Sequence, residues 1–220
     1  MKHFCLSNSA KSRLLLVLFN CYVAHLAVAQ QSSGQGSFRF VNATSIPGKV
    51  FLAIDGKKLR PEGFDSGNTT GAIGILAGTH RFAVSSPSNG TAEVSASVQP
   101  GSSVTMIAYC KTVIDPRTRQ PTEVLQLLPR QNPPHTRARQ FQLLFLSSRP
   151  SIDLTINGQN RSVSALREIG SDQLPTTQIK IEHGTKPVVT FDAPEAGNFL
   201  VVIFEDKAGK VSGVVIPDYG

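Results

Sequence analysis

Cysteine is scarce in this 220-residue chain, which contains three cysteines and no tryptophan. Cys5 and Cys21 lie in an amino-terminal segment that we expect to be removed, so Cys110 would be the only cysteine of the mature protein. A single cysteine excludes an intramolecular disulfide, which is unusual for a eukaryotic secreted domain of this size. The composition therefore favours a bacterial exported protein that is stabilised by burial of apolar side chains.

Metal-ligand and catalytic motifs are also missing from the sequence. His80, His135 and His183 follow the amino-terminal segment, and none has a second histidine or a cysteine at zinc-ligand spacing. There is no G-x-S-x-G, H-E-x-x-H or P-loop motif. We therefore expect no metal, no cofactor and no enzymatic activity. A catalytic triad scattered along the chain leaves an uncharacterised envelope hydrolase as an alternative.

Only the amino-terminal segment approaches a membrane-spanning length of apolar residues: it begins with LLLVLF at residues 14–19 and continues, interrupted by Asn20 and His25, to Ala29. This run is preceded by Lys2, Lys11 and Arg13 without any acidic residue, and it is followed by the small-residue site Ala27-Val28-Ala29. That order of charge, apolar core and small residues predicts a secretory signal peptide, residues 1–29, cleaved before Gln30. Cleavage would lower the formal net charge from +7 to +4, because three basic residues are lost.

The alternative for this segment is a membrane anchor, but Asn20 and His25 interrupt the apolar run. A membrane-spanning helix needs about 20 predominantly apolar residues. We therefore expect an exported protein, periplasmic or extracellular, with no stable membrane insertion after cleavage.

Helical spacing is nearly absent, and alternation with a period of two residues dominates. Residues 93–98 and 152–156 alternate polar and apolar side chains, as expected for strands with one buried face. Residues 143–146 and 199–204 are apolar on both faces, which indicates central strands or strands at a contact between domains. The best helical candidate is 162–169, about two turns. Many short strands separated by Gly, Asn and Pro turns predict an all-β protein.

The two halves of the chain resemble each other. Residues 38–56 match 141–158, with Asp55-Gly56 corresponding to Asn157-Gly158 at an offset of 102 residues. Residues 100–107 match 196–203 at an offset of 96. This order predicts duplication of one unit. We expect two tandem immunoglobulin-like antiparallel β-sandwich domains, residues 30–128 and 138–220.

A proline-rich segment, residues 129–137, separates the two predicted domains. It contains three prolines within six residues, and a proline has no N–H to donate to a β-ladder. We expect a short, fairly stiff linker.

Positive charge gathers between the halves, in residues 111–139. An arginine-rich hairpin and linker could bind an acidic polysaccharide, because guanidinium groups pair with carboxylates in two-pronged geometry. The four candidate contacts are Arg117, Arg119, Arg137 and Arg139. Such runs are more often solvated surface. Nucleic acid is disfavoured, because aromatic residues are missing among these basic ones.

Two further residues have simple structural interpretations. Cys110 shares a strand face with Met106 and Ala108, which indicates a small apolar packing residue. His80 is in phase with Phe82 on a predicted strand, which indicates packing at the strand end.

Three motifs of the first half stand out together, and they are Arg39-Phe40-Val41-Asn42-Ala43-Thr44, Ile54-Asp55-Gly56 and Ala77-Gly78-Thr79-His80-Arg81-Phe82. In these motifs the first half resembles a family of bacterial secreted β-sandwich repeats of unknown function. The family's usual histidine is Asn42 here, and the second half lacks the polar part of the motif. The whole-chain plan of a signal and two β domains also resembles the periplasmic accessory proteins of alginate O-acetylation.

Neither resemblance supplies catalytic residues. Together with the absence of catalytic motifs, they imply a non-catalytic exported binding or scaffold protein of the bacterial cell envelope or extracellular space. An envelope protein or an acidic polysaccharide would be its partner. The alternative is an accessory role in exopolysaccharide O-acetylation or export. The oligomeric state does not follow from the sequence.

Overall fold

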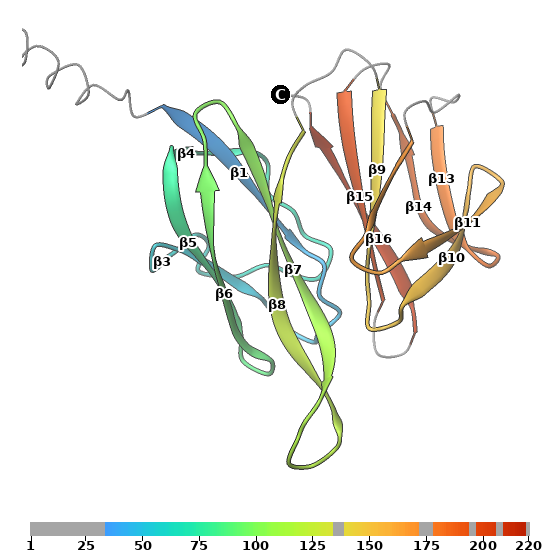
Figure 1. The fold of residues 1–220 in the computed structure, drawn as a ribbon, viewed down its shortest axis with the longest axis horizontal. Coiled ribbons are helices and arrows are strands. Elements are labelled where there is room, and N and C mark those ends of the chain that lie inside the picture. The colour runs from blue at the N-terminus through green and yellow to red at the C-terminus, as the bar shows by residue number, and fades with distance from the viewer. Residues whose placement is uncertain (1–33, 134–138, 172–177, 194–196, 206–208, 219–220) are drawn as a thin grey trace, which may run out of the picture. The chain divides into compact units, whose positions relative to one another are not determined.

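The computed structural model describes residues 34–133, 139–171, 178–193, 197–205 and 209–218 (Figure 1). The predicted signal peptide and the segment 134–138, which includes Arg137 and His135, lie outside the described residues. All regular structure that is described is strand. No helix in these ranges is long and apolar enough to cross a membrane.

The first half forms a β-sandwich of two four-stranded sheets, with orders β4-β1-β7-β8 and β3-β2-β5-β6. Its strands are β1 (Gln35–Asn42), β2 (Phe51–Ile54), β3 (Lys57–Lys58), β4 (Ile73–Leu76), β5 (Gly78–Ser86), β6 (Gly90–Val98), β7 (Ser103–Ile114) and β8 (Pro121–Gln131). The predicted turn at Asp55-Gly56 joins β2 to β3, with φ angles of 49° and 81°. Positive φ at both central residues is typical of a tight hairpin turn.

The second half is also a sandwich, with sheet orders β12-β9-β15-β16 and β11-β10-β13-β14. Its strands are β9 (Arg139–Leu146), β10 (Ser151–Ile156), β11 (Gln159–Ser164), β12 (Glu168–Ser171), β13 (Gln178–His183), β14 (Lys186–Asp192), β15 (Gly197–Glu205) and β16 (Val211–Asp218). The turn at Asn157-Gly158 repeats the φ values of its counterpart in the first half, at 47° and 80°.

The two halves share one topology. Adding eight to each strand number of the first half converts its sheet orders into those of the second half. The prediction of an all-β protein with two tandem sandwiches is therefore confirmed. The sandwiches are not purely antiparallel, contrary to the prediction, because β1 pairs with β7 in parallel and β9 pairs with β15 in parallel.

The predicted offset of 96 residues for the second match, between residues 100–107 and 196–203, is wrong by one residue. It equates Val104 with Leu200, but Val104 belongs to the first core whereas Leu200 lies on the opposite face of its strand. In the strand pairings, Val104 lies beside Phe38 and Phe199 lies beside Phe141, which gives an offset of 95. A shift of one residue moves every side chain to the other face of a sheet, so the residues that are buried in the core determine the correct register.

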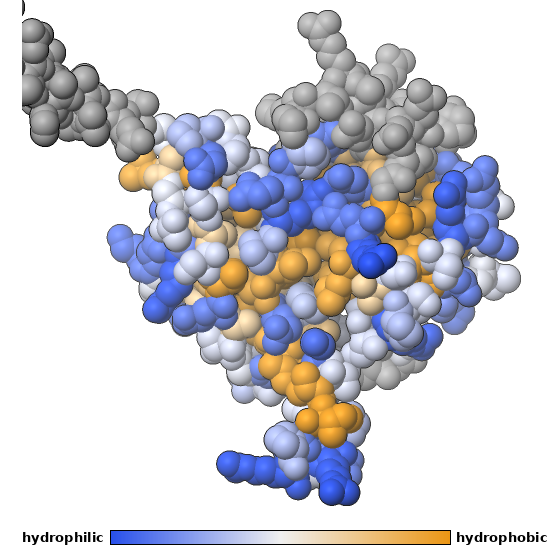
Figure 2. All heavy atoms as spheres, in the orientation of Figure 1, coloured by the Kyte–Doolittle hydropathy of each residue, from blue (hydrophilic) through white to orange (hydrophobic). Residues whose placement is uncertain are grey.

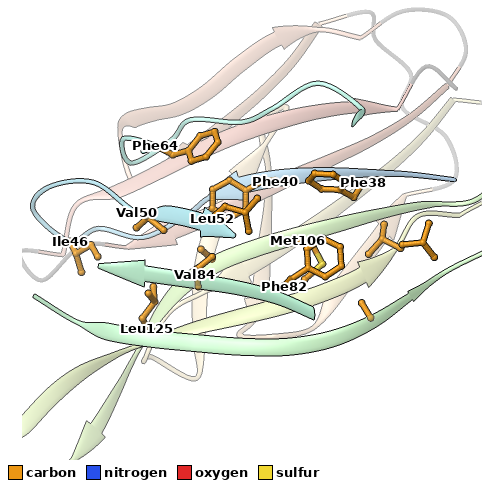
Figure 3. Packing of buried hydrophobic residues seen from close by; sticks show 14 residues of the cluster. Phe38, Phe40, Ile46, Val50, Leu52, Phe64, Phe82, Val84, Met106 and Leu125 are labelled. Atoms are coloured by element: carbon orange, nitrogen blue, oxygen red, sulfur yellow. The ribbon is translucent and has the colours of Figure 1, made fainter. Parts of the chain in front are cut away.

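Each sandwich has its own apolar core. In the first core, two residues of β1 form edge-to-face aromatic pairs (Figure 3). Phe38 packs against Phe82 of β5 in the other sheet, with ring centroids 5.6 Å apart. Phe40 packs against Phe64, with ring centroids 4.9 Å apart. The second core is more aliphatic, with Leu143 and Ile203 among its fully buried residues. Burial of this kind supplies the main stabilisation of the described residues, in which Cys110 is a free cysteine.

A third apolar cluster lies between the sheets that contain β1 and β9. Its buried residues are Val41, Ala43, Ile107, Leu144, Leu146, Leu200, Val202, Phe204 and Ile216. It explains the two segments that are apolar on both faces, because alternate residues of β9 and β15 enter the second core and this third cluster. The prediction of strands covered on both sides is confirmed, and we call this cluster the junction.

Two further sequence-based expectations, a helix at residues 162–169 and a linker that begins at residue 129, are wrong. Residues 162–169 form no helix, because β11 pairs with β10 and the chain then turns at Leu166, with φ of 59°, into β12. The linker does not begin at residue 129, because β8 continues to Gln131.

Pro129 is accommodated because β8 is an edge strand. Ala108 O accepts from Ala43 N, so even-numbered residues of β7 direct their backbone groups away from β8. Pro121 and Pro129 lie opposite such even-numbered residues, and their nitrogens therefore point to the open edge. No ladder hydrogen bond is lost there, which is where prolines are tolerated in sheets.

Candidate functional site

The hairpin of β7 and β8 extends beyond the first sandwich (Figure 1). β7 has 12 residues, but β1 pairs only with its first six, from Ser103 to Ala108. From Tyr109 to Gln126 the hairpin is therefore a two-stranded ribbon on that side, and we call it the arm. This confirms that the arginine-rich segment 111–139 contains a hairpin.

The turn of the arm is ordered by one carboxylate. Asp115 Oδ1 accepts hydrogen bonds from the backbone N–H groups of Arg117, at 2.7 Å, and Thr118, at 3.3 Å. These backbone hydrogen bonds hold the pKa of Asp115 below its usual value. Arg119 has a φ of 56°, and its N–H donates to Asp115 O at 2.8 Å. The backbone that carries both arginines is thus fixed locally.

Arg117 and Arg119 are both exposed at this turn. Within the described ranges neither guanidinium has an ion-pair partner, so both charges face solvent. Exposed guanidinium groups are suited to bidentate pairing with carboxylates of a partner.

Of the candidate arginines, Arg117 and Arg119 lie together at the turn of the arm, whereas Arg139 lies elsewhere. β8 has 11 residues, which corresponds to about 35 Å from the arm's turn to its far end. There Arg130 contacts Gln142 of β9, and Arg139 is the first residue of β9. Arg139 is thus about one strand length from Arg117 and Arg119, and Arg137 lies outside the described residues.

Aliphatic side chains lie exposed on the arm beside the arginines. Ile114 is 64% exposed and Val113 is 36% exposed, and Figure 2 shows apolar atoms along the arm above a hydrophilic tip. Sequence reasoning treated this strand only as a core strand and missed these residues. Exposed aliphatic and basic groups on one projecting element are features of an interaction surface.

A polar cleft of about 190 Å³ lies at the base of the arm. It is lined from both sandwiches by Ser45, Cys110, Thr112, Glu123, Ser147, Ser148, Arg149, Glu205 and Gly209. Ser148 holds the arm, because its Oγ accepts from Thr112 N at 3.0 Å and donates to Thr112 Oγ1 at 2.6 Å. This cleft was not predicted, because its residues come from five separate segments of the sequence.

The side chain of Glu205 is buried in the cleft, at 6% exposure. Its Oε2 accepts from Ser147 Oγ at 3.0 Å, and its Oε1 lies 2.6 Å from Arg149 Nη2. Its backbone carbonyl accepts from Ser45 Oγ at 3.1 Å. The cleft is therefore organised around one neutralised, buried carboxylate.

His80 is a hydrogen-bonded residue as well as a packing one. Its Nδ1 lies 2.7 Å from Asp55 Oδ2 and its Nε2 lies 2.8 Å from Leu76 O, while its ring contacts Phe82 edge to face. The hydrogen bond with Asp55 raises the pKa of His80 and, reciprocally, lowers the pKa of Asp55. Two acceptors around one imidazole favour its protonated form.

Cys110 packs against the first core with Met106 and Ala108, as predicted, but it is only partly buried and also lines the cleft. In the described part of the chain, no cluster of three His, Cys, Asp or Glu side chains could hold a metal ion.

The motif that carries the family resemblance builds a turn. Asn42 is fully buried; its Nδ2 donates to Phe64 O at 3.0 Å, and its Oδ1 accepts from Thr44 N and Thr44 Oγ1 at 3.1 and 2.6 Å. These hydrogen bonds fix the loop after β1 to the segment around Phe64. The motif thus has a structural role at this position.

No protein-family model matches the chain, and no curated protein matches it in sequence. The arm and the cleft at its base therefore have to be interpreted from their own chemistry.

Proposed function

We propose that this protein is a non-catalytic exported binding or scaffold protein of the bacterial cell envelope or extracellular space, and that the arm is its principal contact surface. The observation that carries the proposal is the exposure of Val113 and Ile114 beside two solvent-facing arginines on a projecting hairpin. Side chains of this kind gain binding free energy when a partner covers them.

The partner that fits this surface is an envelope protein or an acidic polysaccharide. Arg117 and Arg119 would pair with its carboxylates, and the aliphatic side chains would contact its apolar parts. An accessory role in exopolysaccharide O-acetylation or export is the second candidate, and it is favoured by the presentation of both arginines at the tip of the arm.

The test is recovery of partners from a bacterial envelope fraction with the purified exported protein as bait. Replacement of both Val113 and Ile114 by serine should abolish recovery of a protein partner, with the far-ultraviolet circular dichroism unchanged. Recovery that is the same with this variant as with the wild type would show that the arm is not the contact surface.

A second measurement addresses the acidic polysaccharide. The double variant Arg117→Ser/Arg119→Ser should bind an acidic glycan about tenfold more weakly than the wild type, or about 1.4 kcal/mol. Wild-type binding should also weaken as salt is raised, because exposed charges are screened. The matched control is Lys57→Ser/Lys58→Ser, which removes two exposed charges from β3.

Arg137→Ser/Arg139→Ser forms a separate part of this experiment, because Arg139 begins β9, away from the tip, and Arg137 lies outside the described residues. Equal weakening by the tip pair and the lysine control would indicate a general charge effect and contradict the contact model.

A further inference from the structure

We propose that the junction is built as a homodimer interface within one chain, and that the junction face of the second sandwich binds the same face of a second copy of this chain once the first sandwich no longer covers it. A junction face is the side of a sandwich that contributes to the junction, from β1, β7 and β8 in the first half and from β9, β15 and β16 in the second. This inference goes beyond the proposed function, because it concerns the junction rather than the arm.

The junction consists of equivalent positions of the two halves. In the strand pairings Phe38 corresponds to Phe141, an offset of 103 residues. Leu128 corresponds to Val214 in the same way, an offset of 86. Each described first-half residue of the junction therefore has a counterpart that also belongs to it. The pairs are Val41 and Leu144, Ala43 and Leu146, Ile107 and Val202, Tyr109 and Phe204, and Leu128 and Val214.

Polar contacts across the junction are reciprocal. The loops that follow the first strand of each half carry Ser45 and Ser148, again at an offset of 103. Ser45 Oγ donates to Glu205 O of β15 at 3.1 Å, and Ser148 Oγ accepts from Thr112 N of β7 at 3.0 Å. The counterpart of Glu205 is residue 110, two residues before Thr112. The loop of each half thus contacts the corresponding strand of the other half.

A second reciprocal pair joins the first strand of each half to the last strand of the other. Arg39 of β1 donates to Pro217 O of β16. Gln142 of β9, the counterpart of Arg39, accepts from Arg130 of β8. The counterpart of Pro217 is residue 131, next to Arg130. Contacts in which each patch meets its own equivalent are the defining property of an isologous two-fold interface.

The second sandwich has the more apolar of the two junction faces. At the position of Thr105 it has Leu200, and at the position of Arg130 it has Ile216. Two first-sandwich faces would bury two Arg130 guanidinium groups without Glu168, which lies 2.6 Å from that group in this chain. Burial of an unpaired charge is strongly unfavourable, whereas two second-sandwich faces would bury apolar side chains. Glu168 is 34% exposed and can be solvated without Arg130.

In the intact chain the first sandwich covers this face. Leu144 and Val202 are 1% and 0% exposed. A partner on the same chain is present at a higher effective concentration than a second copy in solution. The second copy therefore binds only when the contribution of the first sandwich is weakened.

The test is sedimentation velocity of the full exported chain and its variants at one protein concentration. The wild type should be monomeric. Val41→Asp/Ile107→Asp places carboxylates in the first junction face, outside the first core, and the measured mass should double. A variant that stays monomeric while its far-ultraviolet circular dichroism is unchanged, or a wild type that dimerises to the same extent, would overturn the proposal.

Two matched variants locate the contact. Leu144→Asp/Val202→Asp makes the equivalent change in the second junction face and should leave the chain monomeric. The same two substitutions added to Val41→Asp/Ile107→Asp should abolish its dimer. A dimer formed by either of these variants would show that the second junction face is not the contact and would contradict the proposal.

Val41→Thr/Ile107→Thr is the milder change if the aspartates prevent folding. Its dimer fraction should rise with protein concentration above that of the wild type, and an unchanged fraction would contradict the proposal. Val113→Ser/Ile114→Ser, added to the dimeric variant, should leave the dimer intact. Loss of the dimer would assign it to the arm, so failure of the arm model and failure of the junction model are distinguishable.

Discussion

The two sandwiches have the same strand order, yet they differ at the hairpin that ends each of them. In the first half β7 and β8 have 12 and 11 residues, and six residues of β7 extend beyond its pairing with β1. In the second half β15 has nine residues, and β9 pairs with all but the last. The second half shows that this fold closes without an arm, so the arm is an addition to the sandwich.

The halves also differ inside, at one position of their first strands. Asn42 lies beside Ala108 in the parallel pair of the first half, and the corresponding pair in the second half is Phe145 beside Ile203. The first half fills this position with a hydrogen-bonded amide and the second with an aromatic ring. One topology thus tolerates two solutions, polar and apolar, at the same place.

The largest expected effect comes from removing a buried ring from one core, which tests whether the two sandwiches unfold separately. Phe40→Ala removes a fully buried ring that stacks edge to face on Phe64, and it should lower the free energy of unfolding by about 3–5 kcal/mol. Hydrogen exchange read by mass spectrometry should accelerate first in residues 35–133. Phe145→Ala is the matched variant and should accelerate residues 139–218 first. Equal acceleration in both halves for either variant would mean that the sandwiches unfold as one unit.

A smaller effect is expected at the position where the halves differ. Asn42→Ala leaves Phe64 O and the Thr44 donors without their partner, which should cost about 1–3 kcal/mol. Urea denaturation measures this cost. Asn68→Ala is the control, because Asn68 is exposed and accepts a single hydrogen bond from Asp65 N; its effect should be within about 0.5 kcal/mol. If Asn42→Ala lowers the free energy of unfolding no more than the control does, the structural role of the motif is contradicted.

A substitution in the junction should lower the free energy of unfolding less than a substitution in either core. Val202→Thr places a hydroxyl in an apolar cluster and should cost about 1 kcal/mol, while leaving both cores intact. It should also widen the difference in hydrogen exchange between the halves of the Phe40→Ala protein. Val113→Thr makes the same change on the exposed arm and should be neutral. If the two substitutions have equal effects, the junction does not couple the halves.

Much of this architecture was predictable, because alternation and turn residues report directly on strands. The two segments that are apolar on both faces correctly indicated strands buried on both sides, which is how β9 and β15 enter two clusters at once. The register of the repeat was missed by one residue, because the match of glycines at 101 and 197 carries no information about which face of the strand is buried.

The course of β8 could have been recognised from its prolines. Pro121 and Pro129 are eight residues apart, so in a strand they point to the same side, and two prolines on one side indicate an open edge. The cleft could not have been predicted, because residues as distant as Ser45 and Glu205 are brought together only by the packing of two sandwiches.

The smallest expected effect concerns the pH dependence of stability that arises from the His80–Asp55 pair of the first half. His80 lies between Asp55 and Leu76 O, and the corresponding turn of the second half, at Asn157, has no carboxylate. The raised pKa of His80 means that its contribution to stability is complete below its ordinary pKa of 6.5 and is lost as the pH rises through the folded-state value. The lowered pKa of Asp55 means that its contribution is present above 3.8 and is lost as the pH falls through its folded-state value.

Both contributions are therefore complete between the two ordinary pKa values of 3.8 and 6.5. His80→Asn should lower the Tm more at about pH 5 than at about pH 9, because the wild type has lost its imidazolium at the higher pH. Asn157→Ala removes the acceptor of Lys180 N in the second half, and its effect should not change with pH, since no titrating group is lost. A Tm difference for His80→Asn that is the same at both pH values would show that the imidazole contributes by packing on Phe82 and not by its charge.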